Sequence, residues 1–359
     1  MGLSLENIAN NIHEWLNGTF SATWAMLFEF VLVGASIIGL FAMLGLVLIM
    51  MERKVSAWMQ LRLGPNRVGP VGMFQTVADT LKLMVKEGMT PDGADKFLFN
   101  LAPFIVMIIA MVIMAPLMFA KGFQIWDINI GVLFFTAISS VSVIGILMAG
   151  WASNNKYSLL GAIRSGAQIV SYELSAGFAI LAIVILTGDL KISAIVDSQA
   201  NGWWIFKGHL PVWIAFVIFM IAVTAETNRA PFDLAEAESE LTAGFHTEYS
   251  GMKFALFFLA EYVNIFVVCA VGATLFFGGW QPLHFGTGTK FNEIMDYIPS
   301  SIWFMGKTFF LIFVIMWFRW TFPRLRIDQL LNLEWKYLLP ISMINLLLVT
   351  LIAIMGWHF

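Results

Sequence analysis

Long apolar runs, separated by short polar segments, dominate the chain from residue 26 to its end. A helix needs about 20 apolar residues to cross the hydrocarbon core of a bilayer. Runs of that length lie near residues 26–51, 101–120, 131–152, 166–188, 212–230, 252–278, 301–321 and 337–357. This pattern predicts an all-α polytopic membrane protein with about eight transmembrane helices.

The segment before the first run has a different pattern. Apolar residues recur at helix-like spacing between Leu5 and Leu16, which predicts a short helix lying in the membrane interface. We therefore divide the chain into an N-terminal extension, residues 1–25, and a single transmembrane helical domain, residues 26–359.

Lys and Arg are distributed unevenly between the two ends of the predicted spans. Fifteen of the 20 lie in segments that follow odd-numbered spans, and five lie on the opposite face. Positively charged loops remain on the inner side of a membrane. We therefore expect both termini on the outer, periplasmic side and amphipathic helices on the inner face.

The composition agrees with a membrane protein and narrows its chemistry. Only 12% of the 359 residues are charged, whereas soluble proteins carry about 25%, and the net charge of −3 does not indicate a nucleic-acid partner. The chain has one cysteine, Cys269, and no histidine in the middle of a span. It therefore cannot by itself build an Fe–S cluster, a cysteine-based zinc site or a haem site with paired histidines. We expect no bound metal or flavin in this chain.

The segment 225–250 concentrates acidic residues at the inner membrane boundary. It holds six of the chain's 23 acids and a single base, Arg229. The acids are Glu226, Asp233, Glu236, Glu238, Glu240 and Glu248. Carboxylates in this position are costly, so the cluster indicates a functional role, and proton movement is the chemistry we expect from it.

Proline and capping signals predict how this segment folds. Pro231 should end the fifth span at the residue before it and leave Glu226 in the last turn. Asp233 and Glu236 have the spacing of an N-cap and its reciprocal partner, which predicts a short inner-face helix over 234–243. The remaining acids of the segment have no matching bases within it.

Three further carboxylates lie in or beside the membrane. Glu173 lies about two turns into the fourth span, and Glu261, in the sixth, is the deepest carboxylate of the sequence. Asp79 lies on the polar side of a predicted amphipathic helix. An intramembrane carboxylate is a functional-site hypothesis by default. The structural alternatives are acids that only bond neighbouring helices and an amphipathic helix that only rests on the membrane surface.

Two other sets of polar residues could also have purely structural or lipid-binding roles. Gln168, Tyr172 and Ser175 share one face of the fourth span, a pattern typical of hydrogen bonds between helices. The inner segment after the seventh span carries three arginines, Arg319, Arg324 and Arg326. Their alternative role is the binding of lipid headgroups.

Six motifs, in order along the chain, resemble one protein family. They are Glu52-Arg-Lys with Gly64-Pro-Asn and Gly-Pro70; Ser153-Asn-Asn-Lys-Tyr; Ser171-Tyr-Glu173; Ala225-Glu-Thr-Asn-Arg with Pro-Phe-Asp-Leu; Glu248-Tyr-Ser-Gly with the stretch ending Ala-Glu-Tyr262; and Pro323-Arg-Leu-Arg-Ile-Asp-Gln-Leu330. Together they are similar to the membrane H-subunit family of bacterial NADH:quinone oxidoreductase (respiratory complex I), called NADH dehydrogenase subunit 1 in mitochondria. The resemblance covers about residues 26–357 and is specific because six long motifs coincide.

The resemblance implies a membrane-arm subunit with a wall of a quinone chamber and an acidic channel toward proton-pumping subunits. The residues it assigns to the proton channel are Asp79, Glu173, Glu226, Glu236, Glu238, Glu240 and Glu261. The candidates for the quinone chamber are Arg62, Arg229, Arg324 and Arg326. No catalytic residue, no metal and no activity are expected of the isolated chain.

The implied function is the coupling of quinone reduction to proton pumping in a bacterial inner membrane. The N-terminal extension favours this location over a mitochondrial inner membrane. Quinone is the substrate, and the FMN and Fe–S clusters belong to partner subunits of the peripheral arm. New charge on the quinone would then act on the acids as a coupled set. The other expected partners are the remaining membrane-arm subunits and membrane lipid.

Three alternatives remain at this point. A homologous membrane subunit of an ion-pumping hydrogenase or ferredoxin-linked complex shares the architecture and need not bind quinone. A stand-alone secondary transporter would need discontinuous helices and a midplane substrate site, whereas the polar residues here lie toward the inner face. An assembly scaffold would leave Glu173 and Glu261 unexplained.

Overall fold

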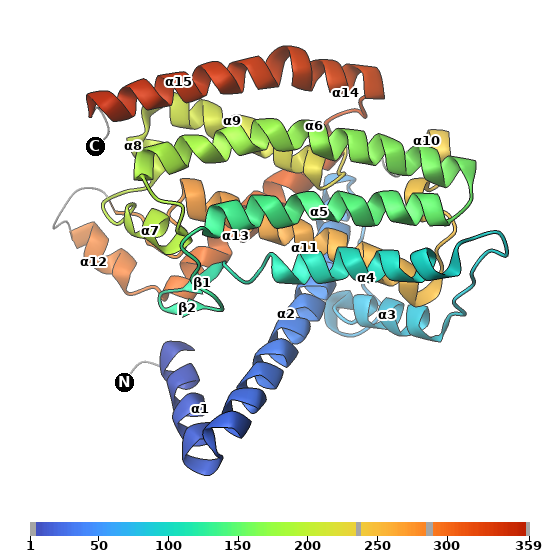
Figure 1. Cartoon of the computed structure of the whole chain (residues 1–359), viewed down its shortest axis with the longest axis horizontal. Coiled ribbons are helices and arrows are strands. Elements are labelled where there is room, and N and C mark those ends of the chain that lie inside the picture. Colours follow the sequence, from blue (N-terminus) through green and yellow to red (C-terminus); the bar gives the residue numbers. More distant parts are fainter. Residues whose placement is uncertain (1–4, 235–237, 285–289, 357–359) are drawn as a thin grey trace.

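The computed structural model describes residues 5–234, 238–284 and 290–356 (Figure 1). The first half contains α1 (Leu5–Thr19), α2 (Ala22–Met59), η1 (Pro70–Gly72), α3 (Gln75–Val85), α4 (Lys96–Val112), β1 (Met118–Ala120), β2 (Phe123–Gln124), α5 (Gly131–Ala152) and α6 (Lys156–Thr187). The second half contains α7 (Ile192–Asp197), α8 (Trp204–Lys207), α9 (His209–Glu226), α10 (Glu238–Leu241), η2 (Gly244–His246), α11 (Gly251–Phe276), α12 (Lys290–Asp296), α13 (Ser300–Thr321), α14 (Ile327–Leu333), the π-helical turn η3 (Glu334–Leu338) and α15 (Leu339–Met355).

Seven stretches within the described ranges are long and apolar enough to cross a membrane. They are α2, α5, α6, α9, α11, α13 and the continuous run α14–η3–α15. The prediction of an all-α polytopic membrane protein is therefore confirmed. The side on which the termini lie stays a prediction, and "inner" and "outer" are used below in its sense.

The second predicted span, 101–120, differs from what the structure contains. A shorter apolar helix, α4, begins at Lys96 because Asp95 caps it, its carboxylate accepting hydrogen bonds from the backbone N–H groups of Phe97 (3.0 Å) and Leu98 (3.3 Å). It ends at Val112, and the chain then forms the antiparallel pair β1–β2. Apolar character continues past the end of the helix, so hydropathy alone placed its boundary too late.

The last predicted span, 337–357, also has a different start. The helical run begins at Ile327, where the side-chain oxygen of Gln329 accepts a hydrogen bond from the Arg326 backbone N–H (3.2 Å). It passes without interruption through the π-helical turn into α15. A charged residue, Glu334, therefore lies inside a span rather than before it.

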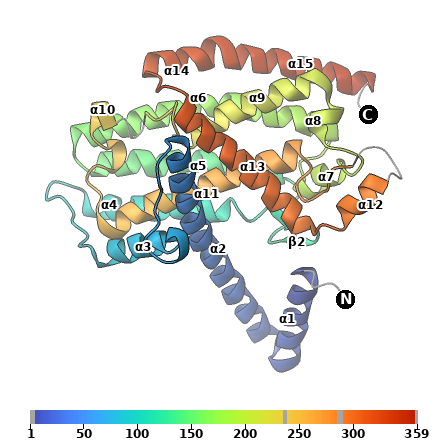
Figure 2. The same ribbon diagram turned by 180° about the vertical axis from the view of Figure 1, so that it is seen from behind.

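Two long helices organise the bundle. Helix α6 packs against α5, α9 and α15, and helix α11 packs against α2, α4 and α13 (Figure 1). The inner half of α2 contacts α3, α11 and α13, whereas its first half projects from the bundle with α1 beside it (Figure 2). The inner ends of α2, α6, α9 and α11 thus meet in one region, and the candidate site lies there.

A close backbone approach positions the acidic segment against α6. At Gly161 an added Cβ would lie 2.8 Å from the Cα of Gly244, the first residue of η2. The Ser158 hydroxyl, three residues earlier, donates a hydrogen bond to the Phe245 carbonyl oxygen (2.8 Å). Small residues at this crossing hold the turn after the acidic segment tightly on the helix.

Candidate functional site

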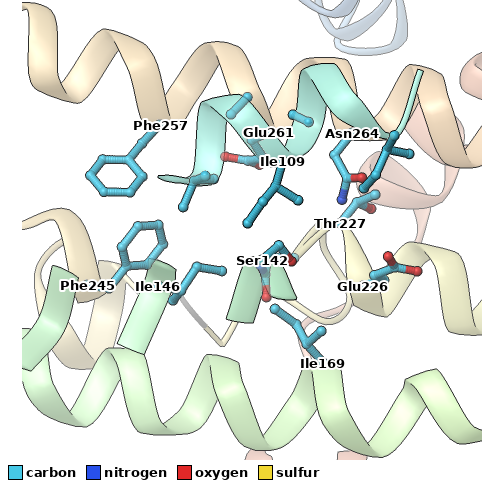
Figure 3. Close-up of a pocket in the computed structure, with 15 residues that line it drawn as sticks. Ile109, Ser142, Ile146, Ile169, Glu226, Thr227, Phe245, Phe257, Glu261 and Asn264 are labelled. Carbon is cyan, nitrogen blue, oxygen red and sulfur yellow. The ribbon is translucent and has the colours of Figure 1, made fainter. Parts of the chain in front are cut away.

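A cavity of about 60 Å³ lies between α4, α5, α6, α9 and α11 (Figure 3). We call it the acid cavity because two carboxylates, Glu226 and Glu261, border it together with Ser142, Thr227, Asn228 and Asn264. The rest of its wall is apolar, including Ile109, Ile113, Ile146, Ile169, Phe245 and Phe257. A water molecule needs about 10–15 Å³ on this scale, so the cavity has room for several waters beside two acids.

Glu226 reaches the cavity because α9 ends at this residue. The predicted end, the residue before Pro231, is too late by a turn: Asn228 has a left-handed φ of 50°, which stops the helix first. Thr227 and Asn228 then turn the chain along the cavity wall. Glu261 approaches from the other side, in the interior of α11, one turn before Asn264 (Figure 3).

A buried arginine connects this cavity with a second group of charges. Arg229 is 5% exposed, and its Nε lies 3.0 Å from Glu261 Oε1. Its Nη1 lies 3.3 Å from Oε1 of Glu52, which also forms an ion pair with Arg319. The guanidinium of Arg229 stacks over the ring of Tyr262, 4.5 Å from its centroid. One cation thus contacts an acid of α2 and an acid of α11.

Next to Arg229 lies a larger cavity of about 360 Å³, which we call the arginine chamber. Its lining residues are Glu52, Arg53, Ser56, Arg229, Ala243, His246, Phe254, Phe258, Tyr262, Arg319 and Trp320. The wall combines aromatic rings with fixed charges, as expected for a site that binds a flat, polar-headed molecule. Its volume falls within the range of small-molecule sites, about 300–1,000 Å³.

The arginine chamber contains three charged residues that the sequence did not place in a quinone chamber or proton channel. Glu52 and Arg53 belong to the first family motif, and Arg319 is the first of the three inner arginines. Of the four arginines expected in a quinone chamber, Arg229 lines it. The family motif was the sequence signal for Glu52. The bases that pair with Glu52, Arg229 and Arg319, are 177 and 267 positions away in the sequence.

The other three predicted chamber arginines lie elsewhere. Arg324 Nη2 lies 3.1 Å from Asp233 Oδ2 and holds the start of the acidic segment. Arg62 and Arg326 are exposed and are not among the residues that line the chamber. Arg62 donates from Nε to Gln60 Oε1 (2.7 Å). The assignment of these arginines to the quinone chamber stays a prediction.

Asp79, a predicted channel residue, contacts Arg53, which lines the arginine chamber. It forms an ion pair with Arg53, accepts a hydrogen bond from Gln75 Nε2 (3.3 Å) and has Lys82 Nζ at 3.8 Å. Burial opposes ionisation of this carboxyl, but the hydrogen bond and charge of Arg53, with the contributions of Gln75 and Lys82, outweigh it and lower its pKa. The predicted amphipathic helix α3 is in this way attached to α2.

Glu173 lies on the opposite side of Glu226 from the acid cavity. Its carboxylate accepts a hydrogen bond from Ser140 of α5. A groove of about 400 Å³, here called the lateral groove, is lined by apolar residues of α5 and α6 together with Glu173 and Glu226. Glu226 therefore borders both the acid cavity and the lateral groove, and it joins the two acids predicted deepest in the membrane, Glu173 and Glu261.

Two of the remaining acids, Glu240 and Glu248, have described contacts with other elements. Glu240 forms an ion pair with Arg164 of α6 (2.6 Å), a base that lies outside the segment and that the segment alone could not reveal. Glu248 accepts a hydrogen bond from Asn155 Nδ2 (2.6 Å). Glu238 begins α10, the described part of the helix predicted over 234–243. Glu236, and with it the predicted capping pair, lies outside the described residues.

The donor set of the site does not favour a metal. Within the described ranges no group of three or more His, Cys, Asp or Glu side chains is placed to hold a metal ion. The acids are instead distributed around cavities and contact bases, hydroxyl groups or amides rather than one another. This arrangement suits the movement of protons among carboxylates and water.

Comparison with known proteins identifies relatives over nearly the whole chain. The profile of the NADH dehydrogenase family matches residues 32–350. The H subunit of NADH-quinone oxidoreductase from Bacteroides thetaiotaomicron is 57% identical over 352 residues, 98% of either chain. The H subunit from Bacillus cytotoxicus is 48% identical over 335 residues, covering 92% of this chain and 96% of its own. NADH-quinone oxidoreductase subunit 8 of Rhodothermus marinus is 47% identical over 336 residues, covering 91% and 96%.

Proposed function

Because this chain belongs to the NADH dehydrogenase family, as a multi-pass membrane subunit of NADH-quinone oxidoreductase, we propose that it couples the reduction of quinone to the movement of protons. The arginine chamber would receive the quinone headgroup, and the acid cavity would begin the proton route. Partner subunits with FMN and Fe–S clusters would deliver the electrons. The remaining membrane-arm subunits would carry the protons across a bacterial inner membrane.

One observation carries this proposal: Arg229 is shared between the two cavities. It contacts Glu52 in the wall of the arginine chamber and Glu261 in the wall of the acid cavity. A change of charge in the chamber is thus one side chain away from an acid of the proton route. Arg229 is largely buried and stacks on Tyr262, so its contacts are screened less than contacts at the surface.

The proposed mechanism begins when two electrons enter the quinone headgroup. The new negative charge attracts Arg229 and Arg319 and weakens the contact between Arg229 and Glu261. At an effective dielectric of about 20, unit charges 4 Å apart interact by about 4 kcal/mol, which corresponds to about a thousandfold in an equilibrium constant. Loss of the cation therefore favours proton uptake by Glu261 from water in the acid cavity.

Glu226 provides the next step in the proposal because it borders both the acid cavity and the lateral groove. A proton taken up beside Glu261 passes through water or Glu226 to Glu173 in the groove. Acids this close titrate as one coupled set. The groove is largely apolar and lies on the outside of α5 and α6, where a neighbouring membrane-arm subunit would cover it.

Glutamine variants of the two cavity acids test the proposal. Glu226→Gln and Glu261→Gln keep the shape and hydrogen bonding of each side chain and remove its proton exchange. In the assembled enzyme, reconstituted in vesicles, we expect proton pumping to be lost and quinone reduction to slow. Asp127→Asn is the control, because it removes the acid of an outer ion pair with Lys191 (2.6 Å) far from the site. Normal pumping in either assembled cavity variant would contradict the assignment.

A further inference from the structure

A buried polar stripe runs along one face of α6. Ser165, Gln168, Tyr172 and Ser175 follow one another at spacings of three and four residues, and each has no exposed surface. At its inner end the stripe meets the acid cavity, because Ser165 Oγ and Gln168 Nε2 both lie within hydrogen-bond distance of Asn228 Oδ1 (3.2 and 3.3 Å). The proposed proton route does not use this stripe.

At its other end the stripe reaches a carboxyl group in the last span. Glu334 lies in the π-helical turn η3, has no exposed surface, and its Oε2 is 3.2 Å from Ser175 Oγ. Its second oxygen, Oε1, is buried and has no hydrogen-bond partner among the residues described. π-Helical turns cost stability and occur frequently at functional sites.

No base compensates this carboxyl group within the part of the chain that the structure describes. The elements packed against its turn are α6, α14 and α15. Asp328 and Lys336 are exposed, and Glu173 faces Ser140 of α5. The remaining titratable group at the contact, Tyr172, donates its hydroxyl hydrogen to the Leu330 carbonyl oxygen (3.1 Å).

The geometry at Ser175 supplies a place for a proton. The Ser175 hydroxyl has one hydrogen but lies near two acceptors, the Tyr172 carbonyl oxygen (3.1 Å) and Glu334 Oε2 (3.2 Å). When the carboxyl group carries a proton, it donates to Ser175 Oγ, and Ser175 donates to the carbonyl. Both hydrogen bonds then form together, and no uncompensated charge is buried.

We propose that Glu334 is a proton-binding site of the membrane span, positioned by Ser175 at the end of the α6 stripe and separate from the acids of the acid cavity. A bound cation such as Ca²⁺ or Mg²⁺ would need about six oxygen ligands, whereas this site offers one carboxyl group, one hydroxyl and the Tyr172 carbonyl oxygen. The proton is therefore the ligand that the residues fit. This assignment does not depend on the proposed quinone chemistry.

Infrared difference spectroscopy of the assembled enzyme, wild type minus variant, tests the site. The carbonyl stretch of a protonated carboxylic acid is expected in the wild type and lost in Glu334→Gln, whose amide retains the shape of the side chain. Glu293→Gln, which changes an exposed acid of α12, should leave the band unchanged. Superimposable wild-type and Glu334→Gln spectra in the carboxylic acid region would overturn the proposal.

A second variant separates proton binding from a structural role and decides the question if Glu334→Gln fails to assemble. Ser175→Ala removes the hydrogen-bond partner, so the same band should persist and shift to higher frequency. A carboxyl group that only supports packing as a charged group has no such band to shift. A Ser175→Ala spectrum identical with the wild type would therefore also overturn the assignment.

Discussion

At the scale of single residues, Arg229 holds together two carboxylates from helices distant in sequence, Glu52 of α2 and Glu261 of α11. Buried charges are stable only when they are paired and hydrogen-bonded, so each of these side chains depends on the others. Removing one partner leaves an uncompensated charge, which costs about 3–5 kcal/mol. Glutamine and lysine variants, which keep most contacts, are therefore more informative than alanine.

Asp79 allows a test of the edge of the arginine chamber through pH. Because the pKa of Asp79 is lowered in the folded protein, its carboxylate stabilises the fold at pH values above the ordinary Asp pKa of about 3.9. This stabilisation is lost as the pH falls through the lowered pKa. We expect Asp79→Asn to lower the Tm of the purified protein equally at pH 7 and pH 5. The difference in Tm between the wild type and Asp79→Asn should narrow only below about pH 4. Differential scanning fluorimetry in detergent measures it, and narrowing already between pH 7 and pH 5 would contradict the ion pair with Arg53.

The sequence identified most of the important acids but not their partners. Glu173, Glu226 and Glu261 were predicted from the cost of a carboxylate in a membrane, and the structure brings Glu226 beside each of the other two. The base that contacts Glu240 is Arg164, 76 positions away. Such pairs depend on the packing of helices, about which local patterns contain no information.

At the scale of elements, the crossing of α6 and η2 fixes the acidic segment relative to the acid cavity. Phe245, the middle residue of η2, lines that cavity, and its carbonyl oxygen accepts the hydrogen bond of Ser158. A shift of η2 therefore moves part of the cavity wall. The crossing tolerates no added atom at Gly161, where the nearest neighbours are backbone atoms of Gly244 and Phe245.

Gly161→Ala is expected to destabilise the protein by about 1–3 kcal/mol, because the backbone of η2 cannot yield to the new methyl group. Gly177→Ala, on the same helix but with no heavy atom near its added Cβ, should leave the protein unchanged or more stable by about 0.5–1 kcal/mol. Thermal unfolding of the two variants measures the contrast. Equal Tm values would show that the close approach does not constrain the segment.

Element boundaries show where hydropathy succeeds and where it does not. The long spans were predicted because apolar runs of 20 residues have few alternatives in a membrane protein. The boundaries were misplaced where a capping side chain or a backbone angle determines the end of a helix, as at Asp95 before α4 and at Asn228 after α9. The late boundary of the last span had the largest consequence, because it placed Glu334 before the span, where a buried acid is not expected.

At the scale of the whole molecule, the bundle places two cavities side by side at the inner ends of its helices. The arginine chamber lies among α2, α11 and α13, and the acid cavity lies among α4, α5, α6, α9 and α11. Helix α11 contributes to both, with Tyr262 on one side and Glu261 on the other. The proposed coupling requires this arrangement, in which one helix contributes to both cavities.

The number of protons pumped per quinone reduced, measured in vesicles with the assembled Arg229→Lys enzyme, shows whether this arginine links the two cavities. Lysine keeps the positive charge but lacks the planar fork that reaches both Glu52 and Glu261. We expect quinone reduction to persist while the ratio of protons to quinone falls well below the wild-type value. Arg164→Lys, which alters the ion pair with Glu240 on the inner surface, is the control and should retain the wild-type ratio. An unchanged ratio in Arg229→Lys would contradict the proposal that this arginine links the two cavities.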